Sequence, residues 1–398
     1  MLRMLRFEFQ KLFSHTIVIG ALAVLLLISV ILLQSYCFNN SSTTVYLPDG
    51  EQLSGREAIL YNQSLAEKYA GDYTDEKISE MALDFSKEYP NDYDALANEG
   101  AVNSSVPTSY LYLTMFIPPQ NYAEIAQDAI REGSSIPPLT EYGLISLRDY
   151  NAAFIDKPLQ YGYNDSWAYF FMGFCGPTLA MAIPTLIVII IAVSMIFSNE
   201  YSLKTDALIL TTKYGKNRQI IAKLLTAFLF ATFIVLGVFF IFVIGFVAQY
   251  GFTGWDADMQ TNLGLSLLSV EIPFNNLQLI LFALFIVWLA SIFIASLTAM
   301  LSAITKTSFS SLIIAFALFV VPRIVRQLMV DGPVRDILIV FPINAVNVQE
   351  VLRLPAYIHS IFYGHPYGPA LCIGIATIVI SIVSSTIAYN TFKNHQPV

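Results

Sequence analysis

The sequence predicts an α-helical polytopic membrane protein: six transmembrane helices, with a mostly helical extracellular domain inserted between the first and the second. Three observations predict this fold class. Of the 398 residues, 56% are hydrophobic and only 13% are charged, whereas soluble domains carry about a quarter charged residues. The hydrophobic residues gather in long blocks, and the charged residues gather between them. One of the intervening segments, residues 38–167, is long and strongly acidic.

The hydrophobic blocks have the length that a membrane span requires. A hydrocarbon core of roughly 30 Å is crossed by about 20 apolar residues in a helix. Five blocks reach this length: Thr16–Cys37, Ala168–Phe197, Leu224–Tyr250, Leu277–Ile304 and Pro369–Tyr389. A sixth, Ser310–Val321, is shorter and is followed by Pro322, so we expect that span to end at the proline. The first block is too long for the apolar core of a signal peptide and lacks a small-residue cleavage site, which favours an uncleaved helix.

The basic residues in the short connecting segments predict the orientation. With the N-terminus inside, the inner segments hold 10 basic residues and three acids. The short outer segments, 250–276 and 322–368, hold four basic residues and six acids. Because Lys and Arg are enriched in cytoplasmic loops, we expect both termini in the cytoplasm and a multi-pass protein of a bacterial plasma membrane. The inner segments are residues 1–15, 198–223, 305–309 and 390–398.

The predicted domains follow from this layout: 1–37 is the cytoplasmic N-terminus and first span, 38–167 the extracellular domain, and 168–398 the remaining spans. The extracellular domain holds 20 acids and 7 basic residues, a net −13. Thr74–Tyr89 has helical spacing of Ile78, Met81, Ala82 and Phe85, and Pro90 ends it. The acidic charge suits either cationic ligands or solubility alone, and solubility is favoured. Four aromatic residues are expected in either a binding face or the domain core, and the core is favoured: Tyr110, Tyr112, Phe116 and Tyr122.

The spans lack groups that perform chemistry. Five of the six apolar cores contain no Asp, Glu, Lys, Arg or His, and ionisable residues mark proton relays and ion-coupled transport. The sequence has no phosphate-binding G-x-x-x-x-G-K-[ST] motif and no H-E-x-x-H motif. Its three cysteines lack metal-ligand spacing. We therefore predict no catalytic, cofactor-binding or metal residue, no enzymatic activity and no nucleic-acid partner; a conduit, a scaffold or a sensor remains.

The segment between the second and third spans, residues 198–223, is the most informative. Leu203, Ala207 and Leu210 share a helical face, and Glu200, Lys204 and Asp206 add polar groups, which predicts a short amphipathic helix. A turn at Tyr214–Gly215 follows, and basic residues then lead into the third span. This pattern fits an ordinary juxtamembrane loop whose lysines set topology, or a helix on which a soluble ATPase docks. Periodicity alone does not choose between them.

The same segment resembles the intracellular coupling segment of ABC-2-type exporter permeases. In that family a Glu after the second span is followed by a Thr, an aliphatic run, and a turn with an Arg and a Lys. The matching residues here are Glu200, Thr205, Leu208-Ile209-Leu210, Arg218 and Lys223. Lys204 stands where the family often has Gly, and Tyr214-Gly215-Lys216-Asn217 replaces a turn that often contains Pro. The apolar run Ile337–Phe341 makes segment 322–368 similar to the family's short re-entrant outer helices.

The resemblance implies a permease subunit that couples ATP hydrolysis by a separate ABC ATPase to export, with peptides or other amphipathic compounds as the expected substrates. It also implies a second permease copy or a paralogous permease, surrounding membrane lipid, and ATP and Mg on the ATPase, with no cofactor in this chain. The implied ATPase-docking residues are Glu200, Leu203, Lys204, Thr205, Ala207, Leu208, Leu210, Tyr214 and Arg218. The alternative is a membrane sensor or assembly scaffold whose extracellular domain binds a ligand without transport.

Overall fold

A computed structural model describes residues 1–89, 107–111, 158–212 and 214–395. This part of the chain contains six helices that are long and apolar enough to cross a membrane. They are Thr16–Phe38, Ala182–Ser202, Gly215–Tyr250, Asn276–Ile304, Ser308–Leu328 and Gly368–Lys393. The six spans predicted from hydropathy are therefore confirmed in number and approximate position.

The chain forms two compact units. The first, which we call the bundle unit, comprises Met1–Leu32, Met172–Val243 and Leu281–Val398. The second, the insert unit, comprises Leu33–Phe171 and Ile244–Ile280.

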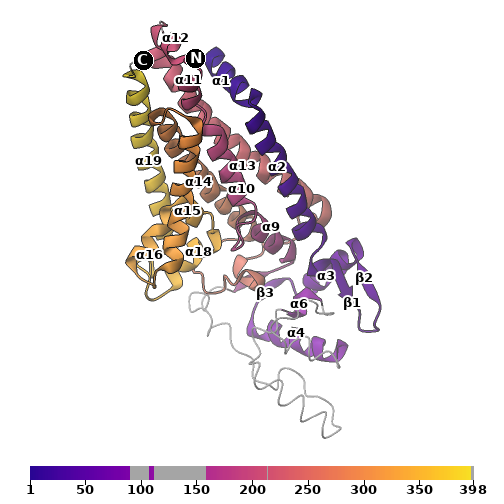
Figure 1. Cartoon of the computed structure of the whole chain (residues 1–398). Coiled ribbons are helices and arrows are strands. Elements are labelled where there is room, and N and C mark those ends of the chain that lie inside the picture. Colours follow the sequence, from indigo (N-terminus) through magenta and orange to yellow (C-terminus); the bar gives the residue numbers. More distant parts are fainter. Residues whose placement is uncertain (90–106, 112–157, 213, 396–398) are drawn as a thin grey trace. The chain divides into compact units, whose positions relative to one another are not determined.

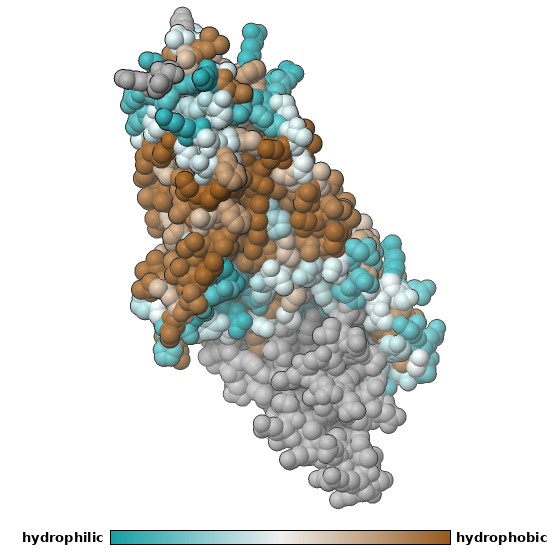
Figure 2. Space-filling view, viewed as in Figure 1, coloured by the Kyte–Doolittle hydropathy of each residue, from teal (hydrophilic) through white to brown (hydrophobic). Residues whose placement is uncertain are grey.

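Long helices build the bundle unit, and both chain termini lie at one end of it (Figure 1). Along the apolar window of Ala182–Ser202, 72% of the residues are buried, against 17% for Gly368–Lys393. The first is thus a central helix and the second a peripheral one. Figure 2 shows hydrophobic residues across the middle of this unit and hydrophilic residues at the end that carries the termini. The principal helices are α1 (Leu2–Ser14), α2 (Thr16–Leu33), α10 (Ala182–Val193), α13 (Ile220–Tyr250), α14 (Asn276–Ile304), α15 (Ser308–Leu328) and α19 (Gly368–Lys393).

The block Ala168–Phe197 differs from the single span expected. It folds as two helices, α9 (Asp165–Cys175) and α10, with a break between them. Pro177 lies in the break and lacks a backbone N–H, and Leu179 adopts a left-handed φ of 54°. Hydropathy cannot detect this break because the residues within it are themselves largely apolar.

The prediction that a span ends at Pro322 is wrong. Helix α15 continues through this proline to Leu328. The proline removes the helical hydrogen bond to the carbonyl of Leu318, a loss that transmembrane helices tolerate. Asn344 Nδ2 donates to the carbonyl oxygen of Pro322 at 3.4 Å. Five short helices follow before the last span: α16 (Pro333–Ile337), η9 (Leu338–Val340), α17 (Pro342–Ala345), α18 (Val348–Arg353) and η10 (Leu354–Ala356).

The insert unit is built from short helices and two small sheets. Strands β1 (Thr44–Tyr46) and β2 (Gln52–Ser54) pair antiparallel, as do β3 (Gly71–Tyr73) and β4 (Leu159–Tyr161). Its described helices include α3 (Arg56–Lys68), α4 (Asp75–Glu88) and α6 (Thr108–Leu111). The segment after α13 joins this unit, since Asp258 Oδ2 accepts from the Gln160 backbone N–H at 2.8 Å. The unit is thus larger than residues 38–167.

Helix α4 confirms the helix predicted over Thr74–Tyr89. Thr74 caps it by accepting a hydrogen bond from the Lys77 N–H. Its four apolar positions are all buried: Ile78, Met81, Ala82 and Phe85. Tyr110 is also buried and packs edge-on against the rings of Tyr69, Phe85 and Tyr89, so it belongs to the core as expected. Tyr112, Phe116 and Tyr122 lie outside the described residues.

Candidate functional site

Residues 198–219, which we call segment 198–219, lie at the end of the bundle unit that carries both termini (Figure 1). The single amphipathic helix expected here is instead two short helices, α11 (Ser198–Ser202) and α12 (Asp206–Thr211), followed by the π-helical turn η6 (Gly215–Gln219). Lys204 separates α11 from α12 in a left-handed conformation with φ of 53°. Because of this break, the predicted face of Leu203, Ala207 and Leu210 is not continuous.

Serine side chains fix the start of the segment. Helix α11 begins at Ser198, and the first backbone N–H groups of a helix have no helical partners. Ser302 Oγ, from α14, accepts from the N–H groups of Phe197 and Ser198 at 3.0 Å each and donates to the Ser194 carbonyl at 2.8 Å. Ser302 is fully buried, so it holds α11 against α14 at one defined place.

A cluster of four charged residues ties the segment to α1 and α13; we call it the charge cluster, and it comprises Glu8, Lys11, Glu200 and Lys223. Lys223 Nζ donates to Glu200 at 2.7 Å and to Glu8 at 2.9 Å. Lys11 donates to the same Glu200 oxygen. Thr205 also donates to Glu200, and Gln219 donates to Glu8.

The charge cluster is neutral in sum and almost entirely shielded from solvent. The side chain of Lys223 is 0% exposed, those of Glu200 and Glu8 are 2% and 3% exposed, and Lys11 is the most exposed at 25%. Two carboxylates face two ammonium groups, so each buried charge has an opposite partner. Removing one partner of such a group is strongly destabilising, whereas the intact group contributes little net stability. The cluster therefore defines geometry more than it adds stability.

His15 borders the charge cluster without adding to its charge. Its Nε2 lies 3.3 Å from Asn199 Nδ2. Burial, with a further contribution from the Lys11 ammonium, lowers the pKa of His15 below its ordinary value. The imidazole is consequently neutral at neutral pH.

The remaining spans reach the segment through α15 and α19. Ser198 Oγ lies 2.9 Å from Ser308 Oγ at the start of α15. The ring of Tyr201 packs on Phe392 of α19, with ring centroids 5.6 Å apart. Past the end of α19, His395 Nε2 lies 3.1 Å from Asp206. Segment 198–219 thus contacts α1, α13, α14, α15 and α19.

A glycine closes the turn between α12 and η6. A Cβ atom built on Gly215 would lie 1.7 Å from the carbonyl oxygen of Ile209. No side chain can therefore occupy this position without moving the backbone. The predicted turn at Tyr214–Gly215 is confirmed, and its compactness brings η6 against α12.

The nine residues predicted to dock an ATPase divide into two sets. Glu200 and Leu210 are buried within this chain, and Thr205 and Ala207 are partly buried. The exposed set contains large apolar side chains, with Leu208 71% exposed and Leu203 60% exposed. The rest of the exposed set is Lys204, Tyr214 and Arg218. We call Leu203, Lys204, Leu208, Tyr214 and Arg218 the exposed face.

The exposed face has polar groups beside its apolar ones. The Arg218 guanidinium lies 4.8 Å from the ring centroid of Tyr214, a cation–π contact that leaves the N–H donors of Arg218 available. Aromatic side chains and Arg are enriched in protein interfaces, and the exposed leucines add apolar surface.

Sequence reasoning missed several residues that position the segment: Glu8, Lys11, Gln219 and Ser302. The sequence contains a signal for one of these residues, Glu8. Glu8 is the single acid among the first 15 residues, within an otherwise basic and apolar stretch. An isolated acid in such a setting suggests an internal partner. Nothing local marks Ser302, because it is one of many small residues in an apolar helix.

Among the described residues, no group of three or more His, Cys, Asp or Glu side chains could hold a metal ion. The segment offers an anchored, partly apolar surface rather than a reactive centre. Fold and site together define a multi-pass helical membrane protein with an anchored loop segment exposed at one bundle end.

Residues 4–389 match the sequence model of the ABC-2 family transporter proteins. Since the match covers nearly the whole chain, the chain belongs to this family, as the resemblance in segment 198–223 indicated. No curated protein and no solved structure matches the chain.

Proposed function

We propose that this chain is the permease subunit of an ATP-driven exporter and that a separate ABC ATPase docks on the exposed face of segment 198–219. One observation carries the proposal: the segment contacts five helices of the bundle unit while directing Leu203, Leu208 and Tyr214 outward. A partner that grips these side chains can displace a part on which most of the spans converge. Family membership supports an ATPase as that partner.

Motion of the segment would be transmitted by contacts of defined geometry. The charge cluster links α11 to α1 and α13, and Ser302 links α11 to α14. Packed elements of this kind move as rigid bodies. ATP binding and hydrolysis, together with Mg, belong to the ATPase in this scheme, and the chain itself contributes the pathway.

The orientation that this scheme requires has both termini and segment 198–219 in the cytoplasm, with the insert unit outside the cell. The excess of basic residues in the short segments near the termini supports it. The pathway would form with a second copy of this chain or a paralogous permease, within a bacterial plasma membrane. Amphipathic compounds, peptides among them, suit spans whose apolar cores are nearly free of charge.

The test is the double substitution Leu203→Asp with Leu208→Asp. Two carboxylates would have to be desolvated at the docking surface, so we expect at least about a tenfold loss of Mg-ATP hydrolysis co-purifying with the tagged chain. Both side chains are exposed, so the thermal stability of the isolated chain should not change. The matched control is Leu60→Asp, an exposed leucine of the insert unit. Undiminished ATPase activity in the double variant would refute docking at the exposed face.

The alternative, a sensor or scaffold without transport, predicts a different outcome in reconstituted vesicles. Such a complex would retain its ATPase, but ATP would drive no movement of an amphipathic fluorescent peptide across the bilayer. An exporter moves the peptide only with ATP, and the double variant abolishes that movement.

A further inference from the structure

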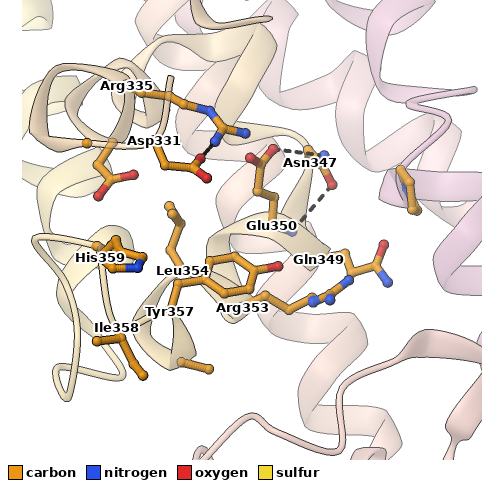
Figure 3. Close-up of a pocket in the computed structure, with 15 residues that line it drawn as sticks. Asp331, Arg335, Asn347, Gln349, Glu350, Arg353, Leu354, Tyr357, Ile358 and His359 are labelled. Atoms are coloured by element: carbon orange, nitrogen blue, oxygen red, sulfur yellow. Dashed lines mark hydrogen bonds and ion pairs between the residues drawn. The ribbon is translucent and has the colours of Figure 1, made fainter. Parts of the chain in front are cut away.

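A polar cavity of about 650 Å³ lies in the bundle unit among the short helices between α15 and α19. Charged walls distinguish it: Arg335 and Arg353 line it together with Asp331, Asp336 and Glu350. Figure 3 shows Asp331, Arg335, Glu350 and Arg353 around the cavity, on α16, α18 and the loop before α16. In Figure 1 these elements lie at the end of the bundle unit opposite to the termini.

The carboxylates of the cavity are already engaged. Glu350 accepts from Arg326 at 2.8 Å and from Asn347 Nδ2 at 3.2 Å. Asp336 accepts from the Ile361 backbone N–H at 3.0 Å. Asp331 pairs with Arg335. Each of the three carboxylates thus accepts from at least one donor of the described residues.

Some donor nitrogens of the arginines in and beside the cavity lack acceptors. Arg353 faces the ring of Tyr357, 5.8 Å from its centroid. Its Nε is buried, as are Nε of Arg335 and one terminal nitrogen of Arg326, and these three atoms lack acceptors in the described part of the chain. A buried donor without an acceptor is costly. The cavity therefore lacks an anionic, acceptor-rich group.

Charge counting leads to the same conclusion. Arg335 and Arg353 line the cavity together with the three carboxylates. Arg323 and Arg326 pair with Glu350 from outside the lining, and with them the group of seven charged residues carries one net positive charge. Planar guanidinium groups bind phosphate and carboxylate oxygens in a bidentate manner. A ligand bearing one negative charge would neutralise the site.

The side chains around the cavity indicate which kind of anionic molecule would bind there. Apolar side chains beside the cavity are strongly exposed, with Val330 89%, Leu328 82% and Ile358 74% exposed. Leu328 is the last residue of the membrane-spanning helix α15, Val330 follows that helix, and Ile358 lines the cavity. A ligand with a charged head and apolar chains satisfies both features, because its head would neutralise the arginines while its chains cover these residues.

We propose that this cavity binds the phosphate group of an anionic membrane phospholipid, with Arg353 and Arg335 as the principal donors. The phosphodiester oxygens accept from the two guanidinium groups. The acyl chains lie along the exposed apolar residues Leu328, Val330 and Ile358.

The test is native mass spectrometry of the full-length chain in detergent, titrated with short-chain phosphatidylglycerol. We expect a saturable lipid adduct, weakened roughly tenfold or more in Arg353→Gln, because one charged hydrogen-bonding group is lost. Arg353→Lys keeps the positive charge but lacks the planar guanidinium group that binds two oxygens at once. Its affinity for the lipid should lie between those of the unaltered chain and Arg353→Gln. Arg335→Gln provides a second variant if Arg353→Gln folds poorly. Arg56→Gln, an exposed arginine of the insert unit, is the charge-matched control and should bind like the unaltered chain.

Two further arms separate the sources of the phosphate. If glycerol phosphate, which lacks acyl chains, fails to displace the lipid, the ligand is the membrane lipid. If it displaces the lipid at equal concentration, the phosphate site stands but the lipid is not its source. Equal binding of phosphatidylglycerol by all the variants, or equal binding of phosphatidylcholine by the unaltered chain, would overturn the proposal.

Discussion

Lys223 is a fully buried ammonium group at the start of an otherwise apolar helix. Its partners Glu8 and Glu200 come from distant parts of the sequence, the N-terminal helix and α11. A charge in this position is tolerated only because the two carboxylates balance the two ammonium groups, those of Lys223 and Lys11. We therefore assign to Glu200 a positioning role, and the docking role to the exposed face.

Replacing Lys223 by Met tests this role at the residue scale. The change leaves Glu8 and Glu200 buried with Lys11 as the single remaining cation, and we expect a loss of about 3–5 kcal/mol in stability. The measurement is the apparent Tm of the chain in detergent. The triple variant Glu8→Gln, Glu200→Gln, Lys223→Met removes the uncompensated charges and should recover much of the loss. A single Met variant as stable as the unaltered chain would show that the cluster has no such role.

Lys204 gives a second prediction at this scale. A residue with a Cβ atom is strained at its φ of 53°, and the family often has Gly at the matching position. We expect Lys204→Gly to raise stability by up to about 1 kcal/mol. Lys204→Ala removes the same charge but keeps the Cβ atom, so its Tm should not rise. A Tm that rises equally in both variants would attribute the effect to charge instead of backbone strain.

At the scale of elements, hydropathy predicted the six spans because the length and composition of a transmembrane helix are local properties. The break between α9 and α10 and the passage of α15 through Pro322 were not predictable in this way. Each depends on how the helix packs within the whole fold, which the composition of one segment does not contain. Helix α4 was predicted because its cap and apolar positions lie within one short stretch.

The candidate site shows the same division. The sequence located segment 198–219 and its turn at Gly215, but it could not tell which side chains face outward. Glu200 is a polar residue in a polar loop, so nothing nearby predicts its burial; its partner Lys11 lies 189 residues away in sequence. Leu208 and Leu203 are the reverse case, apolar residues that the fold leaves exposed.

The junction of α10, α11 and α14 yields a prediction for Ser302. Replacing it by Ala leaves the N–H groups of Phe197 and Ser198 without this acceptor, and we expect a loss of about 1–3 kcal/mol. Ser291→Ala is the matched control, because this buried serine of α14 bonds only to a carbonyl in its own helix, that of Trp288. Tm values in detergent should fall for the first variant and change little for the second. Equal Tm values in the two variants would mean that Ser302 does not hold this junction.

At the scale of the molecule, segment 198–219 connects helices of the bundle unit that differ widely in how much of their surface is buried. The apolar cores contain almost no ionisable residue that could couple transport to an ion gradient. The charged residues that are buried, in the charge cluster, are matched and hold the segment in place. Our proposal therefore assigns the supply of energy to a partner that docks on the exposed face.

Site-specific photo-crosslinking in intact cells tests this claim most directly. A benzophenone side chain at position 208 should crosslink to a protein that mass spectrometry identifies by its nucleotide-binding sequence motifs, and ATPase-specific crosslinks should be absent at position 60. Such a result places the exposed face in the cytoplasm, in contact with the ATPase. Crosslinks to an ATPase from position 60 alone, or no protein crosslink from position 208 in cells that assemble the complex, would contradict the account.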